Sequence, residues 1–377
     1  MYAYTSNPKS LNQEISLTNR VNMRISIIGA GNGGQAMAGH FSLLGHQITL
    51  YNRNLSKIAI VAESKSICLT HAIEGTAKLY CVTDDLAKAI RGAELIMITT
   101  TADAHRELAL QMSPHVEDNQ IIVLNPGSTL GAIDFYNSIS KSTQKRLYIG
   151  EAQSLIYACR AETPGNVRII GVKDKVYFSS YPSEDTLYIL KTLNGIFNCF
   201  IQATNTLVTG LANIGAILHP SVILFNAAAI ERGTLFYFYN DMTPAVAHFL
   251  EQLDKERLSI GRAYGIDLLS VSDWISFAYQ GTKGTTLCEK MQHNPAYYKI
   301  FAPSTLESRL LTEDLPTGIL PMVEMAKIVG ISTPLMEAVL NIGQVLLNRD
   351  FSIHGRTLKN IGMDIEDRSQ IVQIMSR

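Results

Sequence analysis

Three glycines near the start of the chain have a spacing that suits a phosphate-binding turn. Gly29, Gly31 and Gly34 follow an apolar run and open an alanine-rich segment, in the stretch IIGAGNGGQAMA. Glycines at this spacing allow a tight turn, admit a pyrophosphate against the backbone and let a helix pack close to a strand. The helix start then offers unpaired N–H groups and a positive dipole end to phosphates. The spacing therefore indicates dinucleotide binding, and the alternative is a purely structural glycine turn.

The end of the second expected strand bears on which nicotinamide cofactor binds. NAD-binding folds usually carry an acidic residue about 20 residues after the glycines, where it bonds the ribose 2′-hydroxyl. Here the run QITLYNR ends in Asn52 and Arg53, with no carboxylate. An arginine can pair with the 2′-phosphate of NADP, whereas a solvated arginine would tolerate either cofactor. The sequence favours NADP, with NAD as the alternative.

Two later strand ends are expected to face the same crevice. The stretches ITTTADAH and VLNPGST each follow an apolar run. Ligands in open α/β sheets bind beyond the carboxyl ends of the strands. We therefore expect contacts to the cofactor's ribose and nicotinamide from these two loops, although NPGS could be a plain turn. The candidate residues are Thr99, Thr100, Thr101, Pro126 and Gly127.

Candidate acid–base residues lie in the second half of the chain. His219 sits in a strongly apolar segment, where a lone histidine is more often a packed core residue than a catalyst, and Pro220 is expected to kink or interrupt its helix. Arg309 and Asp314 precede Pro316 and are expected on a loop or a helix end, where a solvated charged turn is the plainer interpretation. A dehydrogenase acting on an α-keto acid needs a cation for the carboxylate and a proton donor, and benefits from a carboxylate that fixes the donor's tautomer. Arg309, His219 and Asp314 could supply these three groups.

The elements that would position these residues change type near residue 200. Before it, apolar β-branched runs alternate with helix-like segments, which predicts a parallel sheet covered on both faces. The expected strands are 24–29, 47–52, 95–100, 120–125 and 146–151, and residues 167–182 are expected to form a hairpin at the sheet edge, with turn residues Asn166 and Gly171 around it. The expected helices between the strands are 35–44, 83–90 and 104–112.

After about residue 198 the apolar period is close to 3.6. One helix is predicted from an N-cap at Thr243 and a first residue Pro244 to Gly265, and another from Pro321 toward Gly330. The predicted fold is a Rossmann-type doubly wound parallel α/β domain, residues 23–200, followed by an all-α C-terminal domain, residues 201–377. Residues 1–22 are polar, lack the apolar region of a secretory signal and are expected to be a flexible leader; the alternative is that they precede a natural start at Met23.

Composition limits the partners and the compartment. The 377 residues include 46% apolar and 17% charged residues, with a formal net charge of −1, so no basic footprint for nucleic acid exists. The five cysteines are scattered, with no C-x-x-C pair, which argues against disulfides or a zinc site and favours the cytoplasm. No metal is expected. No uninterrupted apolar run of about 18 residues suggests a membrane span.

The chain resembles the octopine/nopaline-type opine dehydrogenases from Met23 to about Gly343. Residues 27–53 are similar to the family's dinucleotide fingerprint, including its Asn32-Gly33-Gly34 extension, which implies that Asn32 and Gly33 also bind the cofactor. HPSVILFNAAAIERGTLFYFYNDMTPAV with the later DKER resembles the family's helical-domain signature, and SRLLTEDLPTG resembles a later loop. The segment EAQSLIYACR departs from the family pattern at three residues, which bear on substrate preference: Gln153, Ser154 and Ile156.

The resemblance implies a two-domain enzyme with its site in the interdomain cleft. It would condense an α-keto acid with the amino group of an amino acid, using NAD(P)H, with His219 and Asp314 as a proton-transfer dyad and Arg309 as the loop arginine. Two alternatives stay open: a ketopantoate reductase or glycerol-3-phosphate dehydrogenase-like reductase, and a non-catalytic NADP-binding sensor. A homodimer is also considered, because the apolar stretch 236–239 could be core or interface.

Overall fold

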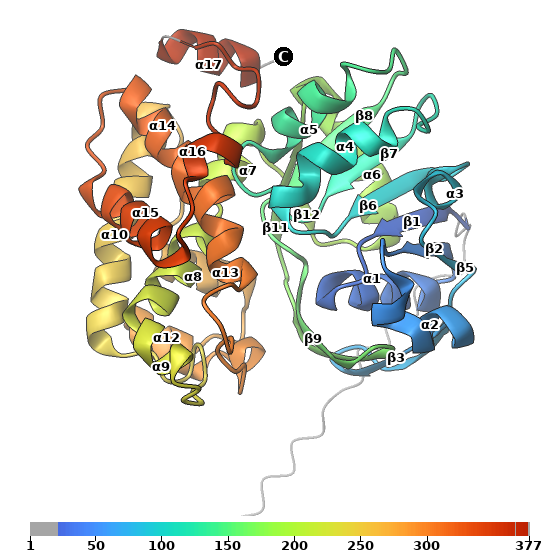
Figure 1. The fold of residues 1–377 in the computed structure, drawn as a ribbon, viewed down its shortest axis with the longest axis horizontal. Coiled ribbons are helices and arrows are strands. Elements are labelled where there is room, and N and C mark those ends of the chain that lie inside the picture. Colours follow the sequence, from blue (N-terminus) through green and yellow to red (C-terminus); the bar gives the residue numbers. More distant parts are fainter. Residues whose placement is uncertain (1–21, 366, 376–377) are drawn as a thin grey trace, which may run out of the picture.

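The structure is a computed structural model that describes residues 22–365 and 367–375. The predicted leader therefore lies outside the described residues, except for Asn22. Figure 1 shows a sheet-containing part, coloured blue to green, beside a helical part, coloured yellow to red. The last strand ends at Gln202 and the first helix of the helical part begins at Thr206, so the change of type falls a few residues after the predicted boundary.

The main sheet is of the Rossmann type. In the described residues it has eight strands, in the order β12-β11-β8-β7-β6-β1-β2-β5. All neighbouring strands from β8 through β7, β6, β1 and β2 to β5 pair in parallel. At the other end of the sheet, β11 is antiparallel to β8, and β12 pairs in parallel with β11. The sheet is thus mixed rather than wholly parallel. Its strands are β1 (Arg24–Ile28), β2 (Gln47–Tyr51), β5 (Cys81–Thr83), β6 (Leu95–Ile98), β7 (Ile121–Leu124), β8 (Tyr148–Ala152), β11 (Val176–Ser180) and β12 (Phe200–Gln202).

The strands are buried on both faces, as their unbroken apolar runs predicted. In β6, Ile96 and Ile98 belong to one core cluster, while Leu95 and Met97 belong to a second. Because side chains alternate along a strand, the two clusters mark the two faces of the sheet. The first face is covered by α3 (Leu86–Ile90), α4 (His105–Met112) and α5 (Gly131–Ile139), and the second by α1 (Asn32–Leu43) and α6 (Thr186–Ile196). Short elements connect them: η1 (Leu55–Ile58), α2 (Ala59–Ser64), η2 (Ala102–Ala104) and η3 (Ser183–Asp185).

A second sheet corrects the predicted hairpin. It has the order β4-β3-β10-β9, with β3 (Ser66–His71), β4 (Gly75–Lys78), β9 (Tyr157–Thr163) and β10 (Asn166–Val172), and it packs on α1. The hairpin predicted over residues 167–182 is wrong, because β10 pairs with β9 and β3, whereas β11 joins the main sheet. Asn166 begins β10 instead of turning the chain, and Gly171 lies at a register shift between β10 and β9. Residues 173–175 therefore connect two sheets.

The C-terminal half is helical, apart from an isolated bridge between Tyr237 and Phe301 in the described residues. Thr243 caps the predicted long helix by accepting a hydrogen bond from the Val246 N–H, and Pro244 is its first residue. Pro220 stands inside α8 without interrupting it, so the predicted interruption is wrong. The helices are α7 (Thr206–Leu211), α8 (Ile214–Phe225), α9 (Ala227–Glu231), α10 (Pro244–Ala263), α11 (Val271–Ala278), α12 (Leu287–His293), η4 (Pro295–Tyr297), α13 (Arg309–Thr312), the π-helical η5 (Leu315–Ile319), α14 (Leu320–Ile328), α15 (Pro334–Leu347), α16 (Phe351–His354) and α17 (Arg368–Met375).

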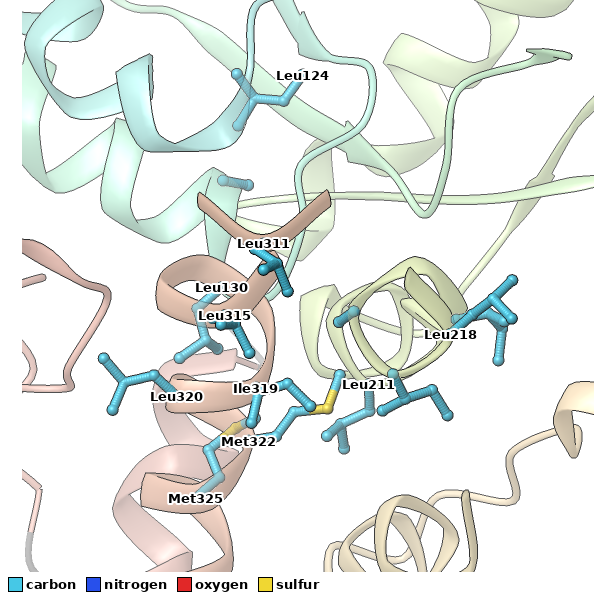
Figure 2. Packing of buried hydrophobic residues seen from close by; sticks show 14 of the residues in the cluster. Leu124, Leu130, Leu211, Leu218, Leu311, Leu315, Ile319, Leu320, Met322 and Met325 are labelled. Carbon is cyan, nitrogen blue, oxygen red and sulfur yellow. The ribbon is translucent and has the colours of Figure 1, made fainter. Parts of the chain in front are cut away.

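One hydrophobic cluster joins the two parts. It contains Leu124 of β7 and Leu130 before α5 together with Leu218 of α8 and Leu315 of η5. Figure 2 shows these side chains and the neighbouring leucines and methionines of the helical part. By length and composition, residues Thr206–Phe225 could cross a membrane, yet 78% of that window is buried inside the fold. This stretch packs in the core as α7 and α8, and α8 holds His219 at the junction of the two parts.

Candidate active site

A cavity of about 360 Å³ is lined by residues of both parts. Its lining comes from the turn before α1, from the loops that follow β6 and β7, and from the helices α8 and α13. The predicted site residues that line it are Gly31, Asn32, Gly33, Thr99, Thr100, Thr101, Pro126, His219, Arg309 and Asp314. Four predicted residues are not part of its lining: Gly29, Gly34, Arg53 and Gly127. Residues separated by almost 300 positions in sequence therefore meet at one cleft.

The glycine turn has the form that a pyrophosphate requires. A Cβ on Gly34 would stand 1.7 Å from the Gly29 carbonyl oxygen, so this glycine lets α1 begin directly against the turn. A Cβ on Gly31, in contrast, would meet nothing within 4 Å, which leaves open space above the backbone. Gly31 is the N-cap of α1, no side chain caps it, and the first turn holds no acidic residue. The free N–H groups and the helix dipole therefore favour an anion at this point.

The turn also lies at the right place in the sheet. The strand order runs from β1 toward β2 and β5 on one side and from β6 toward β8 on the other. Such a reversal opens a crevice beyond the carboxyl ends of the strands, where dinucleotides bind. The Thr99 hydroxyl donates to the carbonyl oxygens of Ile28 and Gly29, at 3.1 and 2.8 Å, and so fixes the turn against β6.

Several polar atoms in the cleft lack partners within the described residues. They are Thr100 Oγ1, both amide atoms of Asn125, Gln153 Oε1 and Ser154 Oγ, all of them buried. Buried polar groups are nearly always hydrogen-bonded, so a cluster of such atoms beside the glycine turn is what a bound polar ligand would satisfy. The residues present thus fit a nicotinamide dinucleotide. Two of the departures from the family pattern, Gln153 and Ser154, also line the cleft, while Ile156 is buried beside it.

Gly127 supports the cleft from behind. A Cβ there would lie 2.5 Å from Glu151 Oε2, so the turn after β7 packs directly on this buried carboxyl group. Glu151 accepts hydrogen bonds from the Ala132 N–H at 2.7 Å and from the Thr209 hydroxyl of α7. Burial raises the pKa of Glu151 to about 7, and its hydrogen bonds oppose that rise. The lack of a side chain at Gly127 therefore allows close packing on Glu151, and a contact of Gly127 with the cofactor stays a prediction.

His219 and Asp314 form the predicted pair. His219 Nδ1 lies 2.8 Å from Asp314 Oδ2, and the two side chains are 17% and 9% exposed. Asn213 caps α8 by accepting from the Ala216 N–H, and the Phe238 ring packs edge-on to the imidazole with 5.8 Å between ring centroids. A carboxylate at Nδ1 places the proton there and leaves Nε2 for exchange with a ligand. Phe238 is 2% exposed, so this part of the apolar stretch 236–239 is core.

The loop predicted around Arg309 and Asp314 is helical. It forms α13 and then the π-helical η5, a kind of element that often occurs at functional sites. The Thr317 carbonyl in η5 accepts hydrogen bonds from the Thr129 N–H at 3.1 Å and the Ser128 hydroxyl at 3.0 Å. The helical part thus holds the loop after β7 in place.

Glu313 also connects the two parts, and Arg309 pairs with it. Arg309 Nη1 lies 3.2 Å from Glu313 Oε2, and Glu313 Oε1 accepts from the Ala102 N–H at 2.9 Å. Burial and the neighbouring Asp314 raise the pKa of Glu313, while Arg309 lowers it. The Arg309 side chain is 53% exposed in the cleft, so its charge remains accessible to an anionic ligand.

Arg356 is an important residue that the sequence did not point to. It follows α16 and is 2% exposed. Its Nε donates to Asp134 at 3.1 Å, Nη1 to the carbonyls of Gly127 and Thr129 at 2.8 and 3.1 Å, and Nη2 to the Ala102 carbonyl at 3.0 Å and His105 Nδ1 at 3.1 Å. All five guanidinium N–H groups are therefore used. Burial, and then the Arg356 charge, lower the pKa of His105, which accepts as a neutral imidazole.

The comparisons with known proteins agree with this arrangement. Residues 202–347 match the family model described as NAD/NADP octopine/nopaline dehydrogenase, alpha-helical domain, and residues 24–139 match NAD-dependent glycerol-3-phosphate dehydrogenase N-terminus. An opine dehydrogenase of Arthrobacter sp. (strain 1C) is 33% identical over 346 residues, covering 90% of this chain and 94% of that protein. An octopine dehydrogenase structure with NADH and L-arginine has a TM-score of 0.73 at 17% identity, covering 94% and 98%. An NADP⁺-bound yersinopine dehydrogenase has a TM-score of 0.64 at 15% identity, covering 94% and 97%.

The phosphate turn, the crevice and the helical part that closes over it define an NAD(P)-dependent dehydrogenase. The chain belongs to the opine dehydrogenase family. It is an oxidoreductase acting on CH–NH bonds, in which an α-keto acid is reductively condensed with an amino group.

Proposed function

We propose that this chain condenses an α-keto acid with the amino group of an amino acid, and that His219 and Asp314 carry out the proton transfers. The observation that carries the proposal is the 2.8 Å contact between His219 Nδ1 and Asp314 Oδ2 in a cleft shared with the glycine turn. The amine attacks the keto carbon, and loss of the carbonyl oxygen as water gives an imine. NAD(P)H supplies the hydride that reduces the imine carbon to the CH–NH product.

Each residue of the cleft has a separate task in this scheme. His219, through Nε2, protonates the departing oxygen and accepts the proton that the amine loses, since an imidazole exchanges protons readily near neutral pH. Asp314 holds the ring in one tautomer and stabilises its charged form. Arg309 binds a substrate carboxylate and polarises the reacting group.

The test is an assay of NAD(P)H oxidation with pyruvate, with and without a panel of amino acids. We expect oxidation that depends on the amino acid, together with a product whose mass is that of an N-(carboxyethyl) amino acid. An equal rate without any amine would instead favour a reductase of the keto acid alone. Tight cofactor binding without any oxidation of NAD(P)H across the panel would favour the alternative of a non-catalytic NADP-binding sensor.

We assign the cofactor preference to Arg53 and propose NADP over NAD. Arg53 is exposed two residues after β2, and the Asn52 side chain before it accepts from the Ala30 N–H at 3.4 Å. Arg53→Asp removes a partner for the 2′-phosphate and adds a partner for a 2′-hydroxyl, so we expect the kcat/KM ratio of NADPH to NADH to fall about 10- to 100-fold. Arg91→Asp, which changes another exposed arginine, is the control. An unchanged ratio in Arg53→Asp would remove this residue from the cofactor site. The homodimer and the cytoplasmic location stay predictions from the sequence.

A further inference from the structure

Lys173 is a buried lysine in the cleft that the proposed scheme does not use. It lies just after β10, is 7% exposed and lines the same cavity as His219 and Arg309. Its Nζ donates to the Leu155 carbonyl and stands 5.8 Å from the ring centroids of both Trp274 and Tyr279. One acceptor and two aromatic faces leave further ammonium donors without a partner in the described residues.

The charges of the cleft are unevenly compensated. Arg309 is paired with Glu313, and His219 is paired with Asp314. In the described residues no carboxylate lies within ion-pair distance of Lys173 or of Arg160, another cation of the lining, which donates to the Cys159 carbonyl at 3.1 Å. A buried charge without a counter-charge is costly, and proteins keep such a charge where a ligand provides the partner. The two substrates of the proposed reaction bring two carboxylates, one each.

The wall around Lys173 fits a small carboxylate. Trp274 Nε1 is buried with no partner in the part of the chain that the structure describes, and Tyr279 and Tyr297 complete an aromatic wall. Aromatic faces hold the ammonium in place without neutralising it. Burial lowers the pKa of Lys173 to about 8, opposed by Cys159 and Cys199, so the ammonium is still mostly charged at neutral pH. The Cys159 thiol beside it is unsuited as a nucleophile, because burial raises its pKa to about 11.

We infer that Lys173 binds a substrate carboxylate in the cleft, as a binding residue distinct from Arg309 and from the His219–Asp314 pair. The inference rests on the proposed function, since it requires two carboxylate substrates. The carboxylate can come from the keto acid or from the amino acid, and the experiment separates these sources. Either source would make Lys173 a determinant of substrate specificity.

The test compares carboxylates with their neutral amides. For the wild-type enzyme, kcat/KM is measured with pyruvate and pyruvamide, and with the best amino acid and its amide. In Lys173→Met, one of these two carboxylate preferences is expected to fall about 10- to 100-fold, through KM, because a charge-assisted hydrogen bond is lost. The preference that falls identifies the carboxylate. Lys173→Arg, which keeps the charge, should retain most of the preference for the carboxylate over its amide. The dissociation constant of NAD(P)H should change little in both variants.

Controls separate binding from folding. Lys175→Met removes an exposed lysine two residues away, whose Nζ lies 5.6 Å from the Phe277 ring centroid, and should leave both preferences unchanged. Lys173→Gln is a second neutral variant in case the methionine destabilises the fold, and thermal unfolding is measured for each protein. If both preferences persist in the neutral variants, or only cofactor binding weakens, the assignment of Lys173 is overturned. A wild-type enzyme without amine-dependent turnover would overturn the proposed function itself.

Discussion

Replacing His219 by alanine is expected to lower kcat by about 10²- to 10⁴-fold, the usual contribution of a positioned acid–base group. The dissociation constant of NAD(P)H should stay nearly unchanged, because His219 belongs to α8 in the helical part, whereas the phosphate turn belongs to the sheet. Steady-state kinetics gives the first quantity, and quenching of protein fluorescence gives the second. Survival of turnover in this variant would show that the dyad assignment is wrong.

The pair can be tested further as a unit. Asp314→Asn keeps the shape of the side chain but no longer stabilises a charged imidazole. Its kcat should therefore fall by an amount in the same range as in His219→Ala. Because the two groups act together, the double variant should be hardly worse than His219→Ala alone. His248→Ala, on the exposed side of α10, serves as the control. If the decrease in kcat of the double variant equals the product of the two single decreases, the two residues act independently, despite the 2.8 Å contact between them.

The parts of the fold that were predicted correctly have local signals. The glycine turn, its strand and its helix lie within one continuous stretch, from Arg24 to Leu43, and the cap at Thr243 is likewise local. His219 and Asp314 are 95 positions apart, and neither residue alone distinguishes catalysis from packing. The family resemblance implies their pairing, and the 2.8 Å distance between His219 Nδ1 and Asp314 Oδ2 agrees with it.

The second sheet shows what periodicity leaves open. A run in which apolar and polar residues alternate indicates a strand, but it does not indicate which strand will pair with it. β10 and β11 are separated by three residues, as in a hairpin, yet they enter different sheets because β10 buries Val167 and Ile169 against the α1 side of the core, with β3 as one partner. That partner is about 100 residues earlier in the chain. The same separation of strands places Lys173 in the cleft.

Buried charged residues were missed for a related reason. In the sequence, Arg356 lies in the polar stretch HGRTLKN, and Lys173 lies in VKDK, where a solvated charge is the ordinary expectation. Burial of such groups is a tertiary property, because the partners come from distant segments. For Arg356 these partners are three carbonyl groups, His105 and Asp134, all more than 220 positions away.

Replacing Arg356 by methionine is expected to reduce the free energy of unfolding by about 3–5 kcal/mol, as found when one partner of a buried ion pair is removed. The loss would remove the guanidinium donor from three carbonyl groups and leave Asp134 with Arg106 as its remaining cation, at 2.9 Å. Denaturant unfolding measures this change. Arg349→Met removes an ion pair with Glu307 in which both side chains are about half exposed, and should cost only about 0–1 kcal/mol.

Arg356 should also affect the cofactor. The carbonyl groups that it holds belong to Gly127, Thr129 and Ala102, in the loops after β7 and β6 that border the cleft. Freed from the helical part, these loops would be less well ordered, so KM for NAD(P)H should rise in Arg356→Met even at temperatures where the variant is fully folded. Arg356→Lys has three donors for five acceptors, so its KM for NAD(P)H should lie between those of the wild type and Arg356→Met. A stable Arg356→Met enzyme with unchanged cofactor KM would show that this arginine does not couple the two parts, and that the Thr317 and Glu313 contacts to the same loops are sufficient.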